Sequence, residues 1–161
     1  MIMKKTLTIS LICFLLSGFI VKLNGQNTVT KQNLQIEKQV DSVFHAMIKD
    51  AENLKYDKLA LGVDDSYHSG FISNESYYMR FDSLITIAQS KSRGVTKQNI
   101  TVEKEKITVL SDNIVLLTAT GISKVDLNSG NSFSVKFFWS FVYERMNMNW
   151  RVIQSHQSNY R

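Results

Sequence analysis

The spacing of apolar residues divides the chain into a helical first half and a strand-rich second half. In residues 34–54 and again in residues 76–90, apolar side chains recur at intervals of three and four, which is the period of an amphipathic helix. Residues 56–61 extend the first pattern and predict a short second helix. Residues 63–74 contain paired aspartates, a glycine and several hydroxyl side chains, and they are predicted to form a loop or a short extended segment.

From about residue 100 onward the apolar period changes to two, which is typical of β-strands. Four segments show this alternation: residues 100–109, which form one strand or a bent pair, and residues 114–125, 133–145 and 150–158. Turn-forming residues separate these segments, and the sequence contains no proline, so long uninterrupted strands are permitted. Helices followed by an antiparallel meander of strands predict a single α+β domain.

The hairpin that closes the chain allows its two faces to be assigned by counting. We expect Arg145 to pair with Trp150 across an even-length turn, which fixes the register of both strands. One face then carries Phe137, Trp139, Phe141, Tyr143, Gln154, His156 and Ser158, and through the preceding turn also Leu116, Thr118, Thr120 and Ile122. The opposite face carries Leu117, Ala119, Gly121, Phe138, Ser140, Val142, Ile153 and Ser155. A bulge of one residue would exchange these assignments.

The two faces predict two different uses. The first combines aromatic walls with a few convergent polar groups, which is the composition of a concave ligand pocket. We expect an unknown apolar or aromatic small molecule to bind there, against Tyr67, Trp139, Phe141, Tyr143, Gln154, His156 and Ser158. The second face is flatter but still apolar, and a sheet that is apolar on both faces must bury both. We therefore expect a homodimer through the outer sheet face.

The N-terminus has the residue order of a secretory signal peptide. Lys4 and Lys5 precede an apolar run over residues 7–21, and Gly25 closes a short region suited to cleavage. We expect cleavage after Gly25 and a secreted or periplasmic protein, whereas an uncleaved segment would anchor the protein to a membrane. The only cysteine, Cys13, would leave with the segment, so the mature protein is expected to form no disulfide.

The predicted mature protein consists of a short lead over residues 26–31 and one domain over residues 32–161. Loss of residues 1–25 removes three lysines and no acidic residue, which lowers the net charge from +5 to +2. The lysines between residues 97 and 106 alternate with acidic residues and form no basic cluster. We therefore expect no nucleic acid partner.

The C-terminal motifs resemble those of a known superfamily. The chain ends in a Phe/Trp-rich strand, the turn Tyr143-Glu144-Arg145-x-Asn147, and the pattern Trp150-x5-His156-x-Ser158. Together with the order of helices and strands, this resembles the nuclear transport factor 2-like superfamily. It is most similar to SnoaL-like proteins and to the association domain of calcium/calmodulin-dependent kinase II.

The resemblance covers roughly residues 32–161 and implies a cone-shaped α+β fold, in which N-terminal helices pack on a curved antiparallel sheet. It implies no single function, because the superfamily includes isomerases, dehydratases, cyclases and oligomerisation domains. Many relatives carry a second histidine where this chain has Gln154, and an amide cannot act as a base near neutral pH.

His156 is the candidate catalytic residue, because an imidazole titrates near neutral pH. It would act as a base or proton relay with Asp65 or Tyr67 as partner; the alternative is a histidine that only forms hydrogen bonds with its neighbours. A metal site built from His45, His68 and His156 is not expected, since His45 has no partner histidine one turn away. No phosphate-binding glycine loop is present, and we predict no metal and no cofactor.

These observations favour a secreted small-ligand-binding domain with an apolar pocket and without enzymatic activity. One alternative is a SnoaL-like isomerase, dehydratase or cyclase that uses His156 as its base. Another is an oligomerisation or interaction module in which the pocket is incidental.

Overall fold

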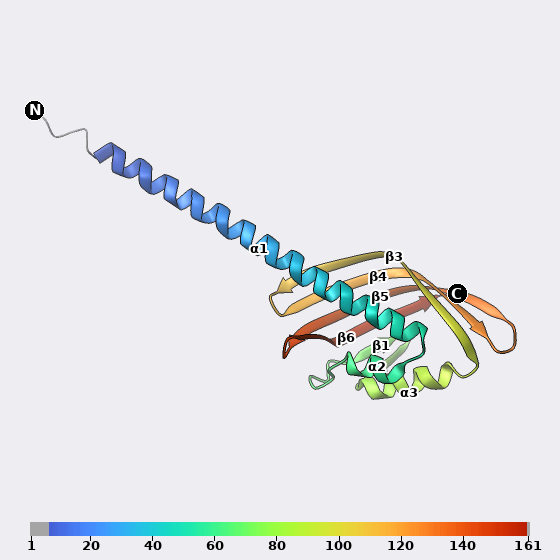
Figure 1. Ribbon diagram of the computed structural model, residues 1–161. Coiled ribbons are helices and arrows are strands. Elements are labelled where there is room, and N and C mark those ends of the chain that lie inside the picture. The colour runs from blue at the N-terminus through green and yellow to red at the C-terminus, as the bar shows by residue number, and fades with distance from the viewer. Residues whose placement is uncertain (1–6, 161) are drawn as a thin grey trace, which may run out of the picture. The chain divides into compact units, whose positions relative to one another are not determined.

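A computed structural model describes the backbone of residues 7–160 and the side chains of residues 29–160 (Figure 1). The chain divides into two compact units, residues 1–36 and residues 37–161. Helix α1 (Leu7–Glu52) begins well before the predicted residue 34. None of the helices in the described residues combines the length and the hydropathy that a membrane-spanning helix requires. The side chains of the predicted signal segment, Cys13 included, lie outside the described part of the chain, and its cleavage stays a prediction.

The two remaining helices follow the sequence pattern with one difference. Helix α2 (Tyr56–Leu61) has the predicted bounds, whereas α3 (Phe81–Lys91) begins five residues later than its apolar pattern indicated. The residues before α3 instead form a small hairpin of β1 (Phe71–Ser73) and β2 (Ser76–Tyr78). Asn74 makes the turn with φ 53°, and its backbone N–H donates to the Gln157 carbonyl at 2.7 Å. A left-handed turn residue is incompatible with a helix, so the helix starts after the hairpin.

Within the described residues, six strands form one sheet in the order β2-β1-β6-β5-β4-β3. The four long strands are β3 (Val95–Ser111), β4 (Ile114–Leu127), β5 (Ser132–Met146) and β6 (Asn149–Tyr160). These four pair as an antiparallel meander, and among the six strands of the described residues the β1–β6 pair is the parallel one. The predicted α+β organisation is confirmed. The segment predicted as one strand or a bent pair over residues 100–109 is the single long strand β3, which is interrupted by bulges.

The predicted register between β4 and β5 is wrong by one residue. The structure pairs Gly121 with Phe137, and Asp126 with Ser132. The turn between the strands contains three residues, closed by a hydrogen bond from Leu127 N–H to the Asn131 carbonyl at 2.9 Å, with Gly130 at φ 84°. A three-residue turn with a left-handed glycine inserts an odd number of residues, whereas counting assumed four. The faces of β4 are therefore exchanged relative to the prediction.

The register between β5 and β6 begins as predicted and then shifts. Arg145 pairs with Trp150 across a two-residue turn, but beyond Val152 the residue Ile153 is bulged out. Val152 also exchanges backbone hydrogen bonds of 2.9 Å with Gly62 and Asp64 on its other side. The bulge changes the direction of every later side chain of β6, as one inserted residue must. Gln154, His156 and Ser158 are consequently not on the face of Trp139, and that prediction is wrong.

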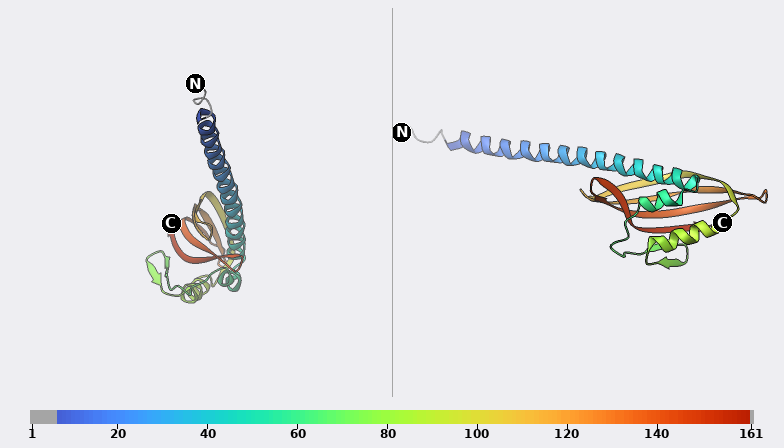
Figure 2. Two further views of the ribbon diagram at one scale, coloured as in Figure 1. Left: turned by 90° about the vertical axis from the view of Figure 1, so that its left-hand side faces the viewer. Right: turned by 60° about the horizontal axis from the view of Figure 1, so that its bottom comes forward.

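Two faces result from these registers. The inner face carries Val115, Leu117, Ala119, Gly121, Phe137, Trp139, Phe141, Tyr143, Val152, Ser155 and Gln157. The outer face carries Leu116, Thr118, Thr120, Ile122, Phe138, Ser140, Val142, Gln154, His156 and Ser158. Residues 37–52 of α1 cover the inner face together with α2 and α3, so the core lies between these helices and the inner face (Figure 2).

Candidate functional site

A cavity of about 250 Å³ lies between the helices and the inner face of the sheet. Residues 44–51 of α1, together with α2 and α3, supply Phe44, Met47, Ile48, Ala51, Tyr56, Leu59, Phe81, Leu84, Ile85 and Ala88. The sheet and the segment before it supply Val63, Gln98, Ile100, Trp139, Phe141, Val152, Ser155 and Gln157. The helical residues line the cavity because their three- and four-residue spacing places them on one side of each helix.

Aromatic side chains of β5 form the back wall of the cavity. Phe137 stacks on Trp139 with ring centroids 4.0 Å apart, and the indole of Trp139 meets Phe141 edge to face at 6.2 Å. The indole N–H donates to Asn159 Oδ1 at 3.3 Å, which fixes the plane of the ring. Phe44 of α1 contacts Phe141 at a centroid distance of 5.9 Å. The wall is therefore rigid, since every ring is held by another ring or by a hydrogen bond.

The polar groups of the cavity are few and uncharged. Ser155 is fully buried, and its hydroxyl accepts a hydrogen bond from Gln157 Nε2 at 3.3 Å. Gln98 lines the cavity from β3, and Tyr56 lines it from α2. Among the lining residues, the phenol of Tyr56 is the single titratable group. Such a site offers hydrogen bonds to a ligand but supplies no base or acid that works near neutral pH.

Three of the predicted ligand-binding residues lie on the inner face, as counting indicated. Trp139 and Phe141 line the cavity. Tyr143 is fully buried beside them, and its hydroxyl donates to the sulfur of Met47 at 3.6 Å. Burial, followed by the charge of Glu105, raises the pKa of Tyr143 far above its usual value. Tyr143 therefore stays protonated and acts as part of the core.

The other three predicted residues of the hairpin lie on the outer face. Ser158 Oγ and His156 Nε2 are 3.3 Å apart, and His156 is exposed. Both line an open groove of about 610 Å³, together with Lys104, Glu105, Lys106, Thr118, Ala119, Thr120, Phe138, Trp139, Ser140 and Tyr160. The sheet therefore separates His156 from the cavity.

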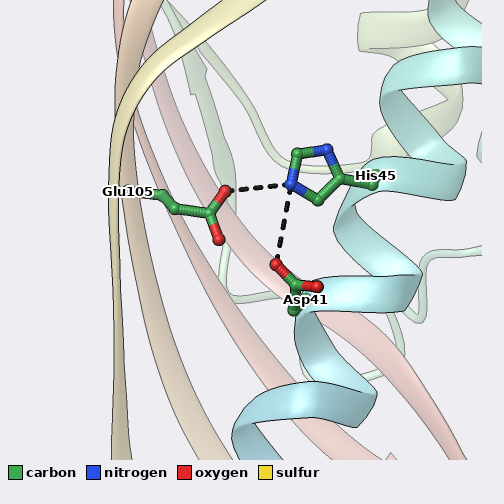
Figure 3. Close-up of side chains that lie close together, drawn as sticks. All are labelled: Asp41, His45 and Glu105. Carbon is green, nitrogen blue, oxygen red and sulfur yellow. Dashed lines mark ion pairs between the residues drawn. The ribbon is translucent and has the colours of Figure 1, made fainter.

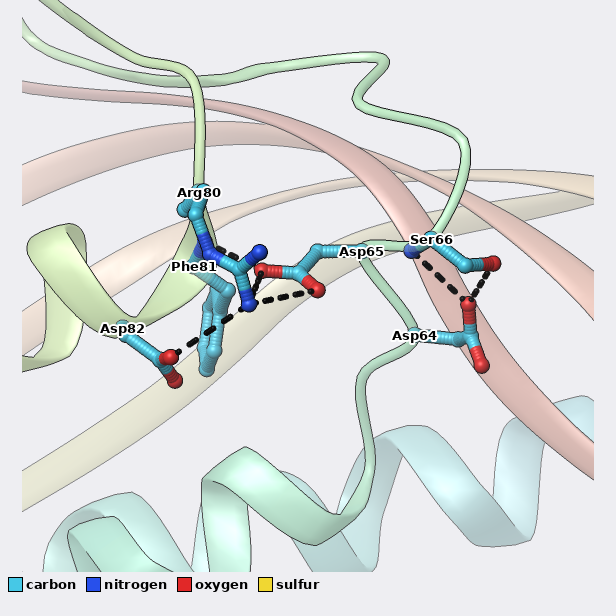
Figure 4. A network of polar contacts seen from close by, with 6 residues as sticks. All are labelled: Asp64, Asp65, Ser66, Arg80, Phe81 and Asp82. Atoms are coloured by element: carbon cyan, nitrogen blue, oxygen red, sulfur yellow. Dashed lines mark hydrogen bonds and ion pairs between the residues drawn. The ribbon is translucent and has the colours of Figure 1, made fainter.

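Polar contacts within the loop before β1, and from this loop to the start of α3, hold the loop in place (Figure 4). The carboxylate of Asp65 accepts from the N–H of Phe81 at 3.2 Å and pairs with Arg80 at 3.5 Å, so it caps the start of α3. The hydroxyl and N–H of Ser66 donate to Asp64, and these hydrogen bonds lower the pKa of Asp64.

Tyr67 is exposed, and its hydroxyl donates to Glu144 Oε1 at 3.2 Å, which raises the pKa of Tyr67. It does not line the cavity. Neither this contact nor those of Asp65 joins the loop to His156, so the predicted acid/base pair is not assembled among the described residues.

A polar cluster of Asp41 and His45 on α1 with Glu105 on β3 lies outside the cavity lining (Figure 3). His45 Nε2 is 3.1 Å from Glu105 Oε2 and 3.6 Å from Asp41 Oδ1. Burial, followed by the hydrogen bond with Asp41, raises the pKa of Glu105, and the charge of His45 opposes this. Within residues 29–160, this is the one group of three or more His, Cys, Asp or Glu side chains close enough to share a metal ion.

Sequence reasoning missed Ser155, Gln157 and Gln98 as the polar members of the cavity. Ser155 was assigned to the wrong face because the bulge at Ile153 has no signature in the residues around it. The alternation of Gln98 with the buried Ile100 was a signal that could have placed Gln98 on the inner face.

Similar folds recur among solved structures. A nuclear transport factor 2-like superfamily protein from Salmonella enterica has a TM-score of 0.69 at 12% identity, over 80% of this chain and 94% of that one. The calcium/calmodulin-dependent kinase II hub homology domain from Chlamydomonas reinhardtii has a TM-score of 0.66 at 12% identity, over 78% and 99%. A type 2 hexachlorocyclohexane dehydrochlorinase has a TM-score of 0.65 at 12% identity, over 80% and 87%.

No protein-family model matches the chain, and no curated protein matches it significantly. At identities this low, the structural likeness concerns the fold and carries no activity with it. The element order and C-terminal motifs predicted this architecture, and the similar structures bear it out. The chain has the α+β fold of the nuclear transport factor 2-like superfamily.

Proposed function

We propose that this protein binds a small apolar, aromatic molecule in the inner-face cavity and releases it unchanged. The observation that carries the proposal is the lining: mostly aliphatic and aromatic side chains from the helices and the sheet, with uncharged hydrogen-bonding groups from Ser155 and Gln157 on β6 and from Gln98 on β3. Apolar cavities with few convergent polar groups are typical of sites that bind small molecules.

The size of the cavity narrows the ligand class. An apolar cavity of about 150 Å³ is large enough to hold benzene, and the cavity here measures about 250 Å³. A ligand of two fused rings with one hydroxyl or carbonyl group fits this volume. Its rings would contact Trp139 and Phe141, and its polar group would bond to Gln157 or Ser155.

Catalysis has less support than binding. Proton transfer requires a group whose pKa lies near the working pH and which reaches the substrate. The cavity lining contains no histidine and no carboxylate, and the candidate base His156 is on the outer face. The name of one structurally similar protein, a dehydrochlorinase, describes that protein's reaction and does not supply these groups here.

Calorimetric titration with 2-naphthol, a two-ring compound with one hydroxyl, tests the proposal. At about 0.5 kcal/mol per non-hydrogen atom, its eleven heavy atoms would give a Kd on the order of 100 µM. Ala88→Leu extends a side chain into the cavity and should abolish this binding, whereas Ala46→Leu on the exposed side of α1 should not change it. Equal binding by both variants would rule out the inner cavity as the site.

We also propose that two copies pair through the outer face. Phe138, Ile122 and Tyr160 are 48%, 41% and 60% exposed there, and a free sheet face with large apolar side chains favours association.

Export to the periplasm or medium is proposed from the order of residues 1–25. The intact mass of the protein recovered from culture tests it: loss of 25 residues supports cleavage after Gly25, and the full-length mass contradicts it.

A further inference from the structure

The cluster of Asp41, His45 and Glu105 brings three metal-ligating atoms to one point. Asp41 and His45 are four residues apart on α1, so their side chains lie on the same side of the helix. Glu105 reaches the same point from β3 (Figure 3). One imidazole nitrogen and two carboxylate oxygens lie within 4.8 Å of one another.

The spacing of these atoms matches a coordination shell. Bonds of about 2.0–2.2 Å to a tetrahedral zinc ion place its ligand atoms about 3.3 Å apart. The two separations in the structure, 3.1 Å from His45 Nε2 to Glu105 Oε2 and 3.6 Å to Asp41 Oδ1, lie on either side of this value. Small rotations of the carboxylates would therefore be enough to surround an ion.

Hydrogen bonding alone satisfies this arrangement incompletely, because the hydrogen bond between Asp41 and Glu105 requires one of the two carboxyl groups to hold a proton. The same nitrogen, Nε2 of His45, faces both carboxylates, and its single N–H donates to one acceptor at a time. In the described part of the chain, neither Asp41 nor Glu105 has an ion pair with a lysine or arginine. A metal ion at the centre would satisfy all three atoms together.

The surroundings hold the ligands in place and leave access for an ion. The ring of His45 packs edge to face on the buried Phe44 at 5.4 Å. Near the end of α1, Glu52 Oε1 accepts a hydrogen bond of 2.8 Å from the N–H of Ile100 on β3. The side chains of His45 and Asp41 are 50% and 49% exposed, and that of Glu105 is 25% exposed. Water can therefore fill the coordination positions that the protein leaves open.

We propose that Asp41, His45 and Glu105 form a binding site for one divalent first-row transition metal ion of the Zn²⁺ type. One imidazole and two carboxylates suit such an ion, whereas Ca²⁺ requires six to eight oxygen ligands. The ion joins the C-terminal part of α1 to β3, two elements that frame the cavity. Its role is to fix this wall of the domain, and it does not depend on the ligand proposed for the cavity.

The test is calorimetric titration of tag-free protein, first treated with a chelator and dialysed, with ZnCl₂ at neutral pH. The expected result is one saturable site per chain and a rise in Tm on zinc addition, because an ion that binds the folded state stabilises it. Asp41→Asn and Glu105→Gln should each weaken binding about ten-fold or more. His68→Ala and Glu103→Gln, exposed positions outside the cluster, serve as matched controls and should bind as the wild type does.

Two outcomes would overturn the proposal. One is the absence of saturable binding to a wild-type protein that is folded by circular dichroism; the cluster would then be an ion pair only. The other is binding that His68→Ala weakens as strongly as Glu105→Gln does, which would place the ion elsewhere. Because Asp41 is half exposed, Asp41→Asn should fold, and it keeps the test decisive if a Glu105 variant does not.

Discussion

Filling the cavity should stabilise the protein while removing its binding site. Ala51 lies in the last turns of α1, and its side chain lines the cavity. Ala51→Leu adds three carbon atoms, which the volume of about 250 Å³ can hold. Because the neighbouring lining is apolar, the new side chain would exchange water for contacts with aromatic and aliphatic atoms.

The expected gain follows from the carbon atoms buried. Three groups at about 0.8 kcal/mol each give about 2.4 kcal/mol. Ordering the leucine side chain costs about 0.5–1 kcal/mol. The free energy of unfolding should therefore rise by about 1–2 kcal/mol. The same change at Ala46, which is exposed on the same helix, should alter it by less than about 0.5 kcal/mol.

Urea denaturation followed by circular dichroism measures this difference. With an m value of about 2 kcal/mol per molar, the midpoint of Ala51→Leu should increase by about 0.5–1 M at unchanged m. If the space were already filled by side chains, the added atoms would overpack the core and lower stability by about 1–3 kcal/mol. A lowered midpoint for Ala51→Leu beside an unchanged Ala46→Leu would thus refute the cavity.

Three further predictions concern the sheet and its charges. A Cβ at Gly121 would meet the Thr101 carbonyl oxygen and come within 2.7 Å of Phe137, so Gly121→Ala should lower the free energy of unfolding in urea by at least about 2 kcal/mol. Gly62→Ala, whose added Cβ has its nearest atom at 3.4 Å, should change the free energy of unfolding little. Equal effects of the two substitutions would contradict this packing. Phe138→Glu places a charge on the outer face and should convert a dimer into a monomer by light scattering; an unchanged dimer mass would exclude this face as the interface. Burial and the neighbouring Asp41 raise the pKa of Glu105, so ionisation of this carboxyl group opposes folding. In the presence of a chelator, the stability of the wild type relative to Glu105→Gln should therefore fall as the pH rises from 4.5 through the raised pKa. Parallel pH profiles of the two proteins would contradict this direction of the pKa shift.

Much of the fold could be predicted because periodicity is a local property. The helix over residues 56–61 and the two-residue turn that pairs Arg145 with Trp150 depend on neighbouring residues alone. The later register could not be predicted in the same way. It depends on the left-handed conformation of Gly130 and on the bulge at Ile153. The bulge lies next to Val152, which forms backbone hydrogen bonds with residues 62 and 64, far away in the sequence.

The candidate site was predictable to the same extent. Trp139 and Phe141 were identified as cavity residues, because their alternation on β5 is unaffected by either register shift. The polar members were misplaced, because one bulged residue replaced His156 by Ser155 and Gln157 on the inner face. The exchange places the imidazole of His156 outside the cavity, so it weakens the alternative of proton transfer and leaves binding as the favoured interpretation.

A crystal structure of the protein with 2-naphthol bound would show directly whether the inner-face cavity is the ligand site. We expect the two rings inside the inner-face cavity, against the indole of Trp139, with the hydroxyl bonded to Gln157 or Ser155. A naphthol bound instead in the outer groove beside His156, with the inner cavity closed by its own side chains, would contradict this expectation.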